Sequence, residues 1–567
     1  MTGSFAPGDT IAIAYSENVG AALVADTGVT LEFDETGMFA TLIDIEQSIS
    51  PRWVWWTADT ARALVAVGVR PARCWDLESV HRLLVGGWRG GAGRIWAHRR
   101  GLDAAELPQV AAPDLFSQPG GNDHADAVRP DGHLDPLWID ELWNADLEHL
   151  RTWAGLALDV HHWQLDELAR LPGRPAASST ARSESAAALL CAELEADGLP
   201  IDVAEAERII SSFIGPRPID TADEARLAAE RDQLVLRHLP GSLGDLDLRN
   251  PAGVKSLLRR VGIEVPDTRA WRLERLRDQH EIVDALLTWR KAERIATTFG
   301  YRWLDRHVGP GGRLRGQWSP SDGAAGRMTA TAGLHNMPAE LRPAIVAERN
   351  HMFVRADLGQ IEPRILAAVS NDDALAAATW DDDMYAPVAA RLGVTRDVAK
   401  VAVLGAMYGQ TTGHGAVALR GLESAYPIAM AFLETAARQA EGGNDLRTRG
   451  GRLVRMSDPI DEPGDAPTRS RAAARGRYGR NAMVQGAAAE FFKTWAAIVR
   501  ARCVPIDALI VLCLHDELLV HCRSDCADAA SDIVTDGVQE ASHRWSGANR
   551  VRFVADTSVI TRWSEAT

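Results

Sequence analysis

The chain has 567 residues, 46% of them hydrophobic, which is too long for one core and apolar enough for several packed domains. A formal net charge of −16 argues against a protein that coats nucleic acid, because phosphate neutralisation needs clustered Lys and Arg. No apolar run approaches the roughly 20 residues that span a bilayer, and 6 cysteines without a CxxC pair predict reduced, mostly buried thiols.

The first part of the chain has the pattern of an α/β domain. Short β-rich runs occupy residues 9–33, and residues 52–56 predict another strand, followed by a helix over residues 59–67. A stretch rich in Pro, Gly and Ser over residues 171–180 is typical of a linker. We therefore place the end of an N-terminal domain near residue 180.

The pattern then becomes helical. Residues 183–197 have apolar side chains at helical spacing and are followed by Gly198, which favours a helix end. Later strands are predicted at residues 351–355 and 509–514. The segment 458–468, dense in Pro, Asp and Gly, is predicted to be a flexible insertion.

Arginines gather in the last third of the chain. Arg449, Arg452, Arg455 and residues 469–480 hold many arginines and little acid. Taken alone, such a run is more typical of a solvated loop than of a binding site.

The predicted strand at residues 351–355 leads into an aspartate. The segment is DLGQIEPR, residues 357–364, and a helix is expected directly after the strand because Pro363 is tolerated in a first turn. A carboxylate at a strand end is well placed to hold a metal ion.

A second segment, RDVAKVAVLGAMYG at residues 396–409, predicts a helix. Arg396, Lys400, Leu404 and Tyr408 recur every four positions and therefore share one slowly turning face. Two cations followed by an apolar and an aromatic side chain can hold a triphosphate and then a sugar and base. An amphipathic helix with two solvated cations is an equally good interpretation of this segment alone.

The third segment is LCLHDELLV, residues 512–520, in which apolar residues flank three polar ones. A hairpin turn explains this pattern, yet Asp and Glu are uncommon inside an apolar run unless a metal or partner compensates them. Nucleotidyl transfer needs carboxylates from separate elements to hold two Mg²⁺ about 4 Å apart. Asp357 and Asp516 would meet that demand.

In this order the three segments resemble motifs A, B and C of the family A DNA polymerases. Residues 326–328 with 334–338 resemble the template-primer loop of that family, residues 477–486 its minor-groove helix, and residues 287–301 its thumb helix. The resemblance covers about residues 186–567 and implies a multidomain α/β and α+β chain. An N-terminal ribonuclease H-like exonuclease-type domain at 1–180 would precede a right-hand polymerase domain at 181–567. Its expected parts are a thumb at about 186–315, a palm at about 316–371 and 476–567, and fingers at about 372–475.

The resemblance also implies roles for single residues. The metal ligands would be Asp357, Asp516 and the Leu358 carbonyl, with Glu517 an auxiliary acid and Lys400 the catalytic cation. Nucleotide-binding residues would be Arg396, Lys400, Leu404, Tyr408, Gln360, Glu362, Tyr385 and His515. DNA-binding residues would be Arg327, Asn336, Arg477, Asn481, Gln485 and Thr298.

The sequence departs from the family in places. Leu404 stands where an aromatic residue is usual and Tyr385 where a histidine is usual, so altered kinetic constants with retained chemistry are expected. In the N-terminal domain the first strand lacks the Asp-x-Glu of the family's exonuclease. Asp59 matches the second acidic motif, while Asp146 and Asp159 are weak matches for the last. We therefore predict a domain that has lost proofreading.

The expected function is a template-directed DNA polymerase in repair or replication. Its partners would be primer–template DNA, deoxynucleoside triphosphates and two Mg²⁺ ions, for which Mn²⁺ substitutes, and we expect a cytoplasmic, nucleoid-associated monomer without membrane contact. Three alternatives remain: a DNA-binding pseudopolymerase scaffold, a polymerase with an active 3′→5′ exonuclease, and a single-subunit RNA polymerase. The pair Glu362 and Tyr408 argues against the last, because it would exclude a ribose hydroxyl.

Overall fold

The computed structural model describes residues 5–109, 126–139, 146–239, 247–309, 311–322, 325–409, 415–456, 468–547 and 550–566. Two compact units form, the first from residues 1–197, 317–329 and 350–560 and the second from residues 198–316, 330–349 and 561–567. Across the described residues, no helix combines the length and the apolar character that crossing a membrane requires. The predicted insertion at 458–468 lies, except for Thr468, outside the described residues.

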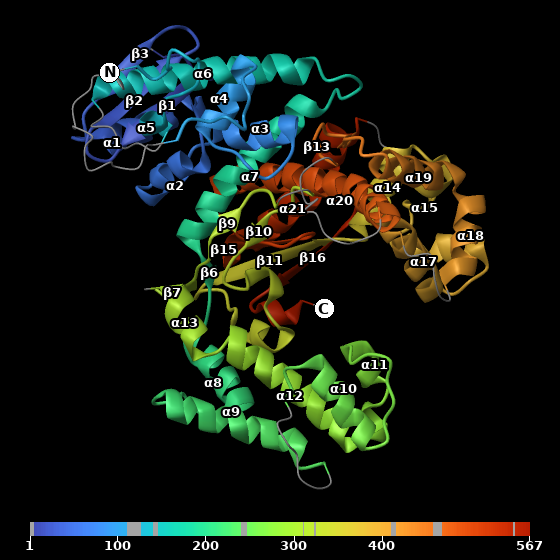
Figure 1. Cartoon of the computed structure of the whole chain (residues 1–567). Coiled ribbons are helices and arrows are strands. Elements are labelled where there is room, and N and C mark those ends of the chain that lie inside the picture. Colours follow the sequence, from blue (N-terminus) through green and yellow to red (C-terminus); the bar gives the residue numbers. More distant parts are fainter. Residues whose placement is uncertain are drawn as a thin grey trace. The chain divides into compact units, whose positions relative to one another are not determined.

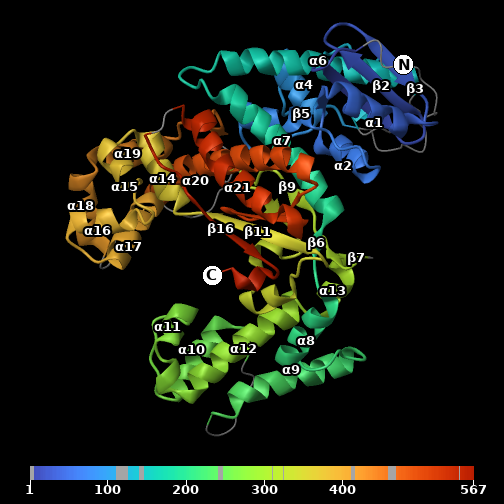
Figure 2. The ribbon, with the colours of Figure 1, turned by 180° about the vertical axis from the view of Figure 1, so that it is seen from behind.

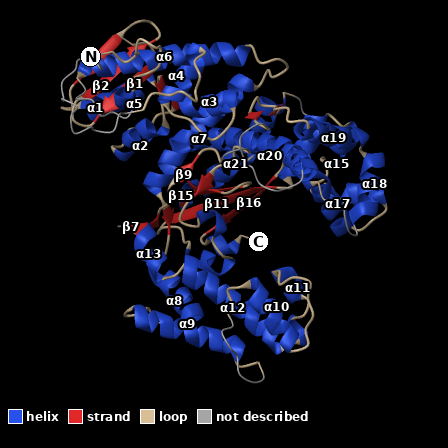
Figure 3. Cartoon of the chain, viewed as in Figure 1, coloured by secondary structure: helices blue, strands red, loops and turns tan. Residues whose placement is uncertain are grey.

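A five-stranded sheet of order β3-β2-β1-β4-β5 begins the first unit (Figures 1 and 3). The strands are β1 (Thr10–Ser16), β2 (Gly20–Ala25), β3 (Thr30–Phe33), β4 (Arg52–Trp55) and β5 (Arg73–Asp76). β1, β2 and β3 pair antiparallel, whereas β1, β4 and β5 run parallel. Since side chains alternate, Ile11 and Ile13 enter one core and Ala12 and Ala14 the other. The predicted α/β start of the chain is confirmed.

Helices cover both faces of this sheet. They are α1 (Met38–Ile49), α2 (Ala58–Ala66), α3 (Leu77–Val85), α4 (Ala92–Arg100), α5 (Pro136–Ile139), α6 (Leu147–Ala169) and α7 (Ala177–Asp197). Residues 171–176 of the predicted linker form a short turn, and residues 177–180 are already the first residues of α7. Helix α7 packs on α2, α3 and β5 and also on α20 (Thr468–Cys503), so these parts of the first unit are continuous. The domain boundary near residue 180 stays a prediction.

A second, four-stranded antiparallel sheet has the order β14-β15-β11-β16. Its strands are β11 (His351–Leu358), β14 (Leu509–Cys513), β15 (Glu517–Arg523) and β16 (Ala555–Ile560). Helices α20 and α21 (Ala527–Ser546) lie on one face of this sheet, and α21 packs on β11, β15 and β16 (Figure 2). Both strands predicted for this part of the chain are confirmed, although β11 extends to Leu358.

Helices and a hairpin separate β11 from α20 in the chain. They are α14 (Ile361–Ser370), α15 (Asp373–Ala378), α16 (Tyr385–Leu392), α17 (Arg396–Tyr408), α18 (Gly415–Ala425), α19 (Pro427–Glu441), β12 (Leu446–Arg447) and β13 (Leu453–Val454). Two short strands precede β11, namely β9 (Trp318–Ser319) and β10 (Thr329–Ala330). The predicted helices after Asp357 and at residue 396 are confirmed.

The second unit is largely helical, as predicted. Its elements are α8 (Val203–Ile214), α9 (Thr221–Leu236), α10 (Pro251–Arg260), α11 (Ala270–Glu274), α12 (Glu281–Thr298), α13 (Tyr301–His307), β6 (Leu199–Pro200), β7 (Val308–Gly309) and β8 (Arg313–Leu314). Helix α12 packs on α8 and α9, and the strands form a small antiparallel sheet.

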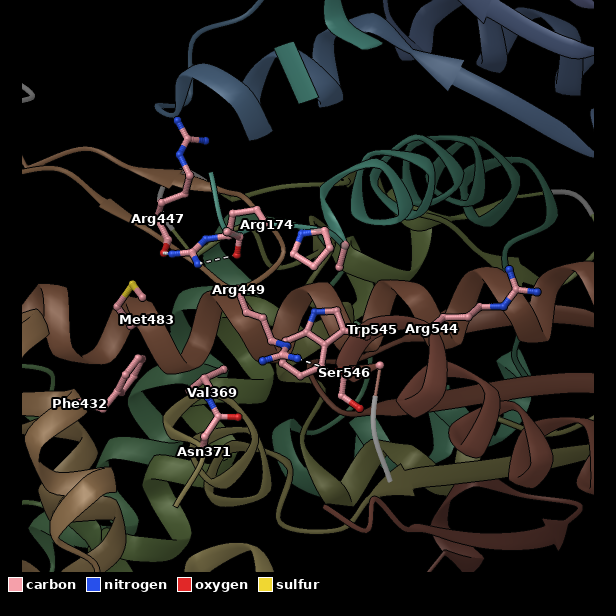
Figure 4. A pocket seen from close by; sticks show the side chains of 14 residues that line it. Arg174, Val369, Asn371, Phe432, Arg447, Arg449, Met483, Arg544, Trp545 and Ser546 are labelled. Atoms are coloured by element: carbon pink, nitrogen blue, oxygen red, sulfur yellow. Dashed lines mark hydrogen bonds between the residues drawn. The ribbon is translucent and has the colours of Figure 1, made fainter. Parts of the chain in front are cut away.

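The arginines of the β12–β13 hairpin do not form the solvated loop that composition alone favoured. Arg449 lies over the ring of Trp545, 5.5 Å from its centroid, and donates to the Ser546 carbonyl at 2.6 Å (Figure 4). Arg452 is 2% exposed and pairs with Glu184 of α7 at 2.6 Å. That interpretation is wrong for these two residues, because packing against α7 buries Arg452 and packing against α21 half-buries Arg449. All six cysteines are free and only Cys526 is partly exposed, as predicted.

Candidate active site

Asp357 and Asp516 meet at one end of the second sheet. The antiparallel register pairs Asp357, near the end of β11, with Glu517 at the start of β15 and with Asp556 on β16. Asp516 lies in the turn between β14 and β15, and its carbonyl accepts a hydrogen bond from the Leu358 amide at 2.7 Å. Carboxylates that are far apart in the sequence therefore reach the same edge of one sheet.

Negative charge is in excess at this edge. Burial raises the pKa of Asp357 to about 6, and repulsion from Asp516 and Glu517 adds to this while Arg355 opposes it. The pKa of Asp516 is also raised, first by burial and then by Glu517 and Glu362. Carboxylates that penalise one another's ionised form are stabilised by a bound cation. The oxygen donors of Asp357 and Asp516 suit Mg²⁺ or Mn²⁺.

Arg355 supplies part of the missing positive charge. Its guanidinium donates to Glu517 at 2.9 and 3.0 Å and to Asp357 at 3.1 Å. Glu517 is therefore held by an arginine, which fits an auxiliary acid. Sequence reasoning missed Arg355, although its place two residues before Asp357 on one strand put it on the same face.

Glu362 and Tyr408 are in direct contact. The Tyr408 hydroxyl donates to one carboxylate oxygen of Glu362 at 2.8 Å, and Arg327 donates to the other at 2.9 Å. The pKa of Tyr408 is raised by burial and by Glu362, and a hydrogen bond with Gln485 opposes this shift. Four predicted site residues from four segments thus form one network.

A second network lies where α14, α16 and α17 begin. Asp383 accepts from Arg396 at 2.5 Å and from the Gln360 amide at 2.9 Å, and the Gln360 side-chain oxygen accepts from the Met384 amide at 2.9 Å. The Arg396 guanidinium lies 5.7 Å from the ring centroid of Tyr385. Asp383 was not predicted, and nothing in its local sequence distinguishes it from the adjacent aspartates.

Gln360 holds its two hydrogen bonds from an uncommon backbone conformation. Its φ is 55°, in the left-handed region, directly before α14. Such a conformation persists where the surroundings determine it, and it is frequent at functional sites. The turn therefore links the end of β11 to Asp383.

The remaining residues of α17 agree with the predicted face. Lys400 is exposed and, within the described residues, forms no ion pair, while Leu404 is half-buried on the same helix. Arg477 of α20 packs against Gly409 at the end of α17, where a Cβ on Gly409 would come within 2.9 Å of the Arg477 side chain.

The other predicted DNA contacts are divided between the units. Asn481 and Gln485 lie on α20, and a buried side-chain oxygen of Asn481 has no hydrogen-bond partner in the described part of the chain. The pKa of His515 is lowered by partial burial and by Arg327. Thr298, at the end of α12, and Asn336 belong to the second unit, and their contacts with DNA stay predictions.

The N-terminal acids are engaged in local structure. Asp59 pairs with Arg62, Asp146 caps α6 and bonds His149, and Asp159 pairs with Arg99. Asp76 is buried, caps α3 and accepts from the Trp55 indole at 2.9 Å. Its pKa is raised to about 6, mainly by burial.

Comparisons with known proteins agree on one family. A family model described as "DNA polymerase family A" matches residues 253–565. DNA polymerase theta of Caenorhabditis elegans is 27% identical over 50% of this chain and 19% of its own length. The thermostable DNA polymerase I of Thermus aquaticus is 26% identical over 60% of this chain and 43% of its own length. The DNA polymerase I of Pseudomonas aeruginosa is 27% identical over 55% of this chain and 36% of its own length. The aligned part of this chain thus spans less than half of each of these relatives.

The fold extends beyond that matched segment. A solved structure described as the POL domain of Pol1 from M. smegmatis in complex with DNA primer-template and dNTP superposes with a TM-score of 0.69 at 20% identity. The superposition covers 99% of this chain and 96% of the chain in the solved structure. The N-terminal sheet is therefore included in the shared fold.

Proposed function

Because the chain belongs to DNA polymerase family A, we propose that it is a template-directed DNA polymerase that adds deoxynucleotides to a primer 3′-hydroxyl. The observation that carries the proposal is the meeting of Asp357 and Asp516, inside the matched segment, with pKa values raised by burial and by neighbouring acids. The names of the relatives support a DNA polymerase, and the complex named for the solved structure supports primer–template DNA and a deoxynucleoside triphosphate as ligands.

In this proposal the acidic edge holds two Mg²⁺ ions through Asp357, Asp516 and the Leu358 carbonyl. Such ions, when bound, lower the pKa of the primer 3′-hydroxyl and neutralise charge at the α-phosphate. Arg355 keeps Glu517 and Asp357 oriented. Lys400 would stabilise or protonate the departing pyrophosphate.

Arg396 and Lys400 would bind the β- and γ-phosphates of the incoming nucleotide. Lys400 is exposed and unpaired within the described residues, whereas Arg396 is bonded to Asp383. Binding of a triphosphate would therefore exchange the Asp383 carboxylate for a phosphate on Arg396. Leu404 and Tyr385 would shape the same nucleotide pocket.

Glu362 would reject ribonucleotides by occupying the space of a 2′-hydroxyl. Hydrogen bonds from Arg327 and Tyr408 hold both of its carboxylate oxygens, so its position is well determined. This arrangement favours deoxynucleotides and disfavours the RNA polymerase alternative. The N3 and O2 acceptors of the minor groove are common to all base pairs. The residues that would contact this groove and the primer end are Arg327, Gln485, Asn481, Arg477 and His515.

The test is primer extension by the purified chain with Mg²⁺ and each nucleotide class. Asp357→Asn and Asp516→Asn are expected to slow extension about a thousandfold or more, equivalent to roughly 4 kcal/mol. Primer–template affinity should stay within a few-fold. Asp556→Asn is the matched control. Asp556 is paired with Asp357 in the sheet, but the side chain of Asp556 is 76% exposed.

Two results would overturn this assignment. Near-normal extension by either Asn variant would contradict the metal site. A wild-type chain that binds primer–template DNA but extends no primer would instead favour the scaffold alternative.

We further propose that the N-terminal domain does not proofread, and that the protein is a cytoplasmic monomer which also accepts Mn²⁺. The local pairing of Asp59, Asp146 and Asp159 supports the first statement. We expect no shortening of an end-labelled primer with a 3′ mismatch when nucleotides are withheld. Shortening that disappears in Asp59→Ala but persists in Asp357→Asn would show an active exonuclease. Sedimentation or light scattering tests the oligomeric state.

A further inference from the structure

A cavity of about 660 Å³ lies between the N-terminal sheet domain and the β12–β13 hairpin, both within the first unit. We call it the Trp88 cavity; its lining includes His81, Trp88, Arg89, Arg94, His98 and Arg455. The loop that carries Trp88 has the sequence GGWRGG, residues 86–91. Figure 1 shows β13 beside α3, where the hairpin reaches this loop.

The Trp88 indole is 65% exposed. A large aromatic side chain that remains in water calls for an explanation, because burying it would stabilise the fold. Glycines with positive φ, a backbone conformation that other residues rarely adopt, shape the loop on which it stands, with φ values of 74° at Gly86 and 77° at Gly87. A Cβ on Gly86 would come within 2.6 Å of the Leu453 carbonyl, so the loop packs tightly on β13.

The cavity carries cations without matching acids. Arg89, Arg94 and Arg455 form no ion pair with a carboxylate anywhere in the described chain, in contrast to Arg82 and Arg99 nearby, which pair with Glu78 and Asp159. Arg455 donates instead to the Val85 carbonyl at 2.7 Å. The Arg89 guanidinium lies 5.1 Å from the ring centroid of Trp88.

The two histidines that line the cavity, His81 and His98, also indicate an excess of positive charge. A ring nitrogen of His81 lies 2.8 Å from one of His98. The pKa of His81 is lowered to about 3, first by burial and then by His98, Arg94 and other cations. Asp103 also lines the cavity, but its carboxylate accepts from the Ala105 amide at 2.8 Å and so belongs to a local turn. The cavity is therefore suited to an anion.

The cavity is distinct from the edge where an exonuclease site would lie. The parallel strands β1, β4 and β5 end at one edge, and α3 starts there at Asp76. Helix α3 has 9 residues, so its far end, next to Trp88, is about 13 Å away along the helix.

We propose that the Trp88 cavity binds a segment of single-stranded DNA, with an unpaired base stacked on Trp88 and adjacent phosphates held by Arg89, Arg94 and Arg455. Aromatic platforms combined with unpaired cations are the usual means of binding single strands without regard to sequence. A base inside a duplex does not offer its face for such stacking, so the single strand is the expected form. The proposal does not depend on polymerase chemistry.

Photocrosslinking tests the location directly. A short single strand that carries 5-iodouracil is mixed with the full-length Asp357→Asn protein and an excess of unlabelled blunt hairpin duplex. The mixture is irradiated, and the adduct is mapped by mass spectrometry. We expect an adduct at Trp88 that the hairpin does not remove and that a blunt duplex carrying the same base does not form. An adduct that the hairpin abolishes, or that the modified duplex forms equally well, overturns the proposal.

Binding by fluorescence anisotropy supplies the second measurement. Trp88→Ala should weaken single-strand binding about tenfold, Trp88→Phe should retain most of it, and Arg89→Gln should reduce the salt dependence. Trp380→Ala is the matched control, since Trp380 is another exposed tryptophan of the first unit, 58% exposed. Equal losses in Trp88→Ala and Trp380→Ala, or no loss in Trp88→Ala, would refute the site. Primer extension by the Trp88 and Arg89 variants should be unchanged. A failure of the single-strand proposal can therefore be distinguished from a failure of the polymerase assignment.

Discussion

Asp357 on β11 is a partly buried carboxylate and Glu184 on α7 a fully buried one, and their neighbours carry opposite charge. Burial alone would raise the pKa of Glu184, but Arg452 and Lys493 outweigh it and lower that pKa. Asp357 faces Asp516 and Glu517 against the single Arg355, and its pKa is raised to about 6. Where the fold supplies every countercharge, the group holds the structure together. Where it leaves charge uncompensated, the group is available to a ligand.

Removing the paired carboxylate Glu184 tests its structural role most directly. Glu184→Gln removes the carboxylate that pairs with both buried cations, Arg452 and Lys493, and is expected to lower the free energy of unfolding by about 3–5 kcal/mol. Denaturant unfolding measures the loss. Extension per folded molecule should be unchanged, because Glu184 does not touch the acidic edge.

Glu167→Gln is the control for that experiment. It also removes a carboxylate bonded to an arginine, Arg170, at 2.8 Å, but at a site where Glu167 is 39% exposed. Surface pairs contribute about 0–1 kcal/mol, so the control should unfold almost as the wild type does. Equal effects of the two variants would contradict the view that burial makes the Glu184 cluster structural.

Glu362 is an intermediate case, since it is paired with Arg327 and yet lies in the proposed nucleotide site. Glu362→Ala is expected to admit ribonucleotides at least about tenfold better relative to deoxynucleotides, roughly 1.4 kcal/mol of lost discrimination. Single-nucleotide extension kinetics with each sugar give the ratio. Tyr408→Phe, which keeps the ring and loses the hydroxyl's bonds to Glu362 and Gln485, should change it less. An unchanged ratio in Glu362→Ala would assign sugar selection to another residue.

The smallest expected effect is on the pH dependence of stability. The folded-state pKa of Asp357, about 6, lies above the ordinary value of 3.8 for an aspartate, so the folded protein binds the proton more tightly than the unfolded chain does. Ionisation of Asp357 therefore costs stability as the pH rises from about 4 to about 6, by roughly 1–2 kcal/mol after allowance for solvent screening.

Asp357→Asn removes this cost. In metal-free buffer the variant should resist urea better than the wild type at pH 8, and the difference should vanish near pH 4. A variant that is less stable at both pH values would show that Asp357 is satisfied by its neighbours, as Glu184 is. Added Mg²⁺ should stabilise the wild type more than the variant.

Much of the site could be anticipated because its parts are local. The strand before Asp357, the helix that begins at Arg396 and the polar turn at Asp516 follow from side-chain periodicity over short windows, which packing elsewhere does not alter. The order of these segments indicated family A, and the family match agrees. Roles assigned to single residues, including Thr298 and Asn336, remain predictions.

Other features were beyond local reasoning. Arg452 belongs to an arginine-rich segment that composition assigned to solvent, and only its packing on α7 explains its burial. Asp383 is one of three successive aspartates, and the fold selects it by placing Gln360 and Arg396 around it. The residues at 171–180 have the composition of a linker but lead into a helix that joins two cores.

The positions of carboxylates at strand ends, the cations that share the α17 face and the order in which they occur could be read from the sequence, because these depend on neighbours along the chain. Which charges are compensated depends on tertiary packing. Arg355 and Glu517 are 162 residues apart, and the register of β11 on β15 alone brings them together. Such pairing depends on the packing of whole sheets and helices, because the free energy of a charge is set by its neighbours in space.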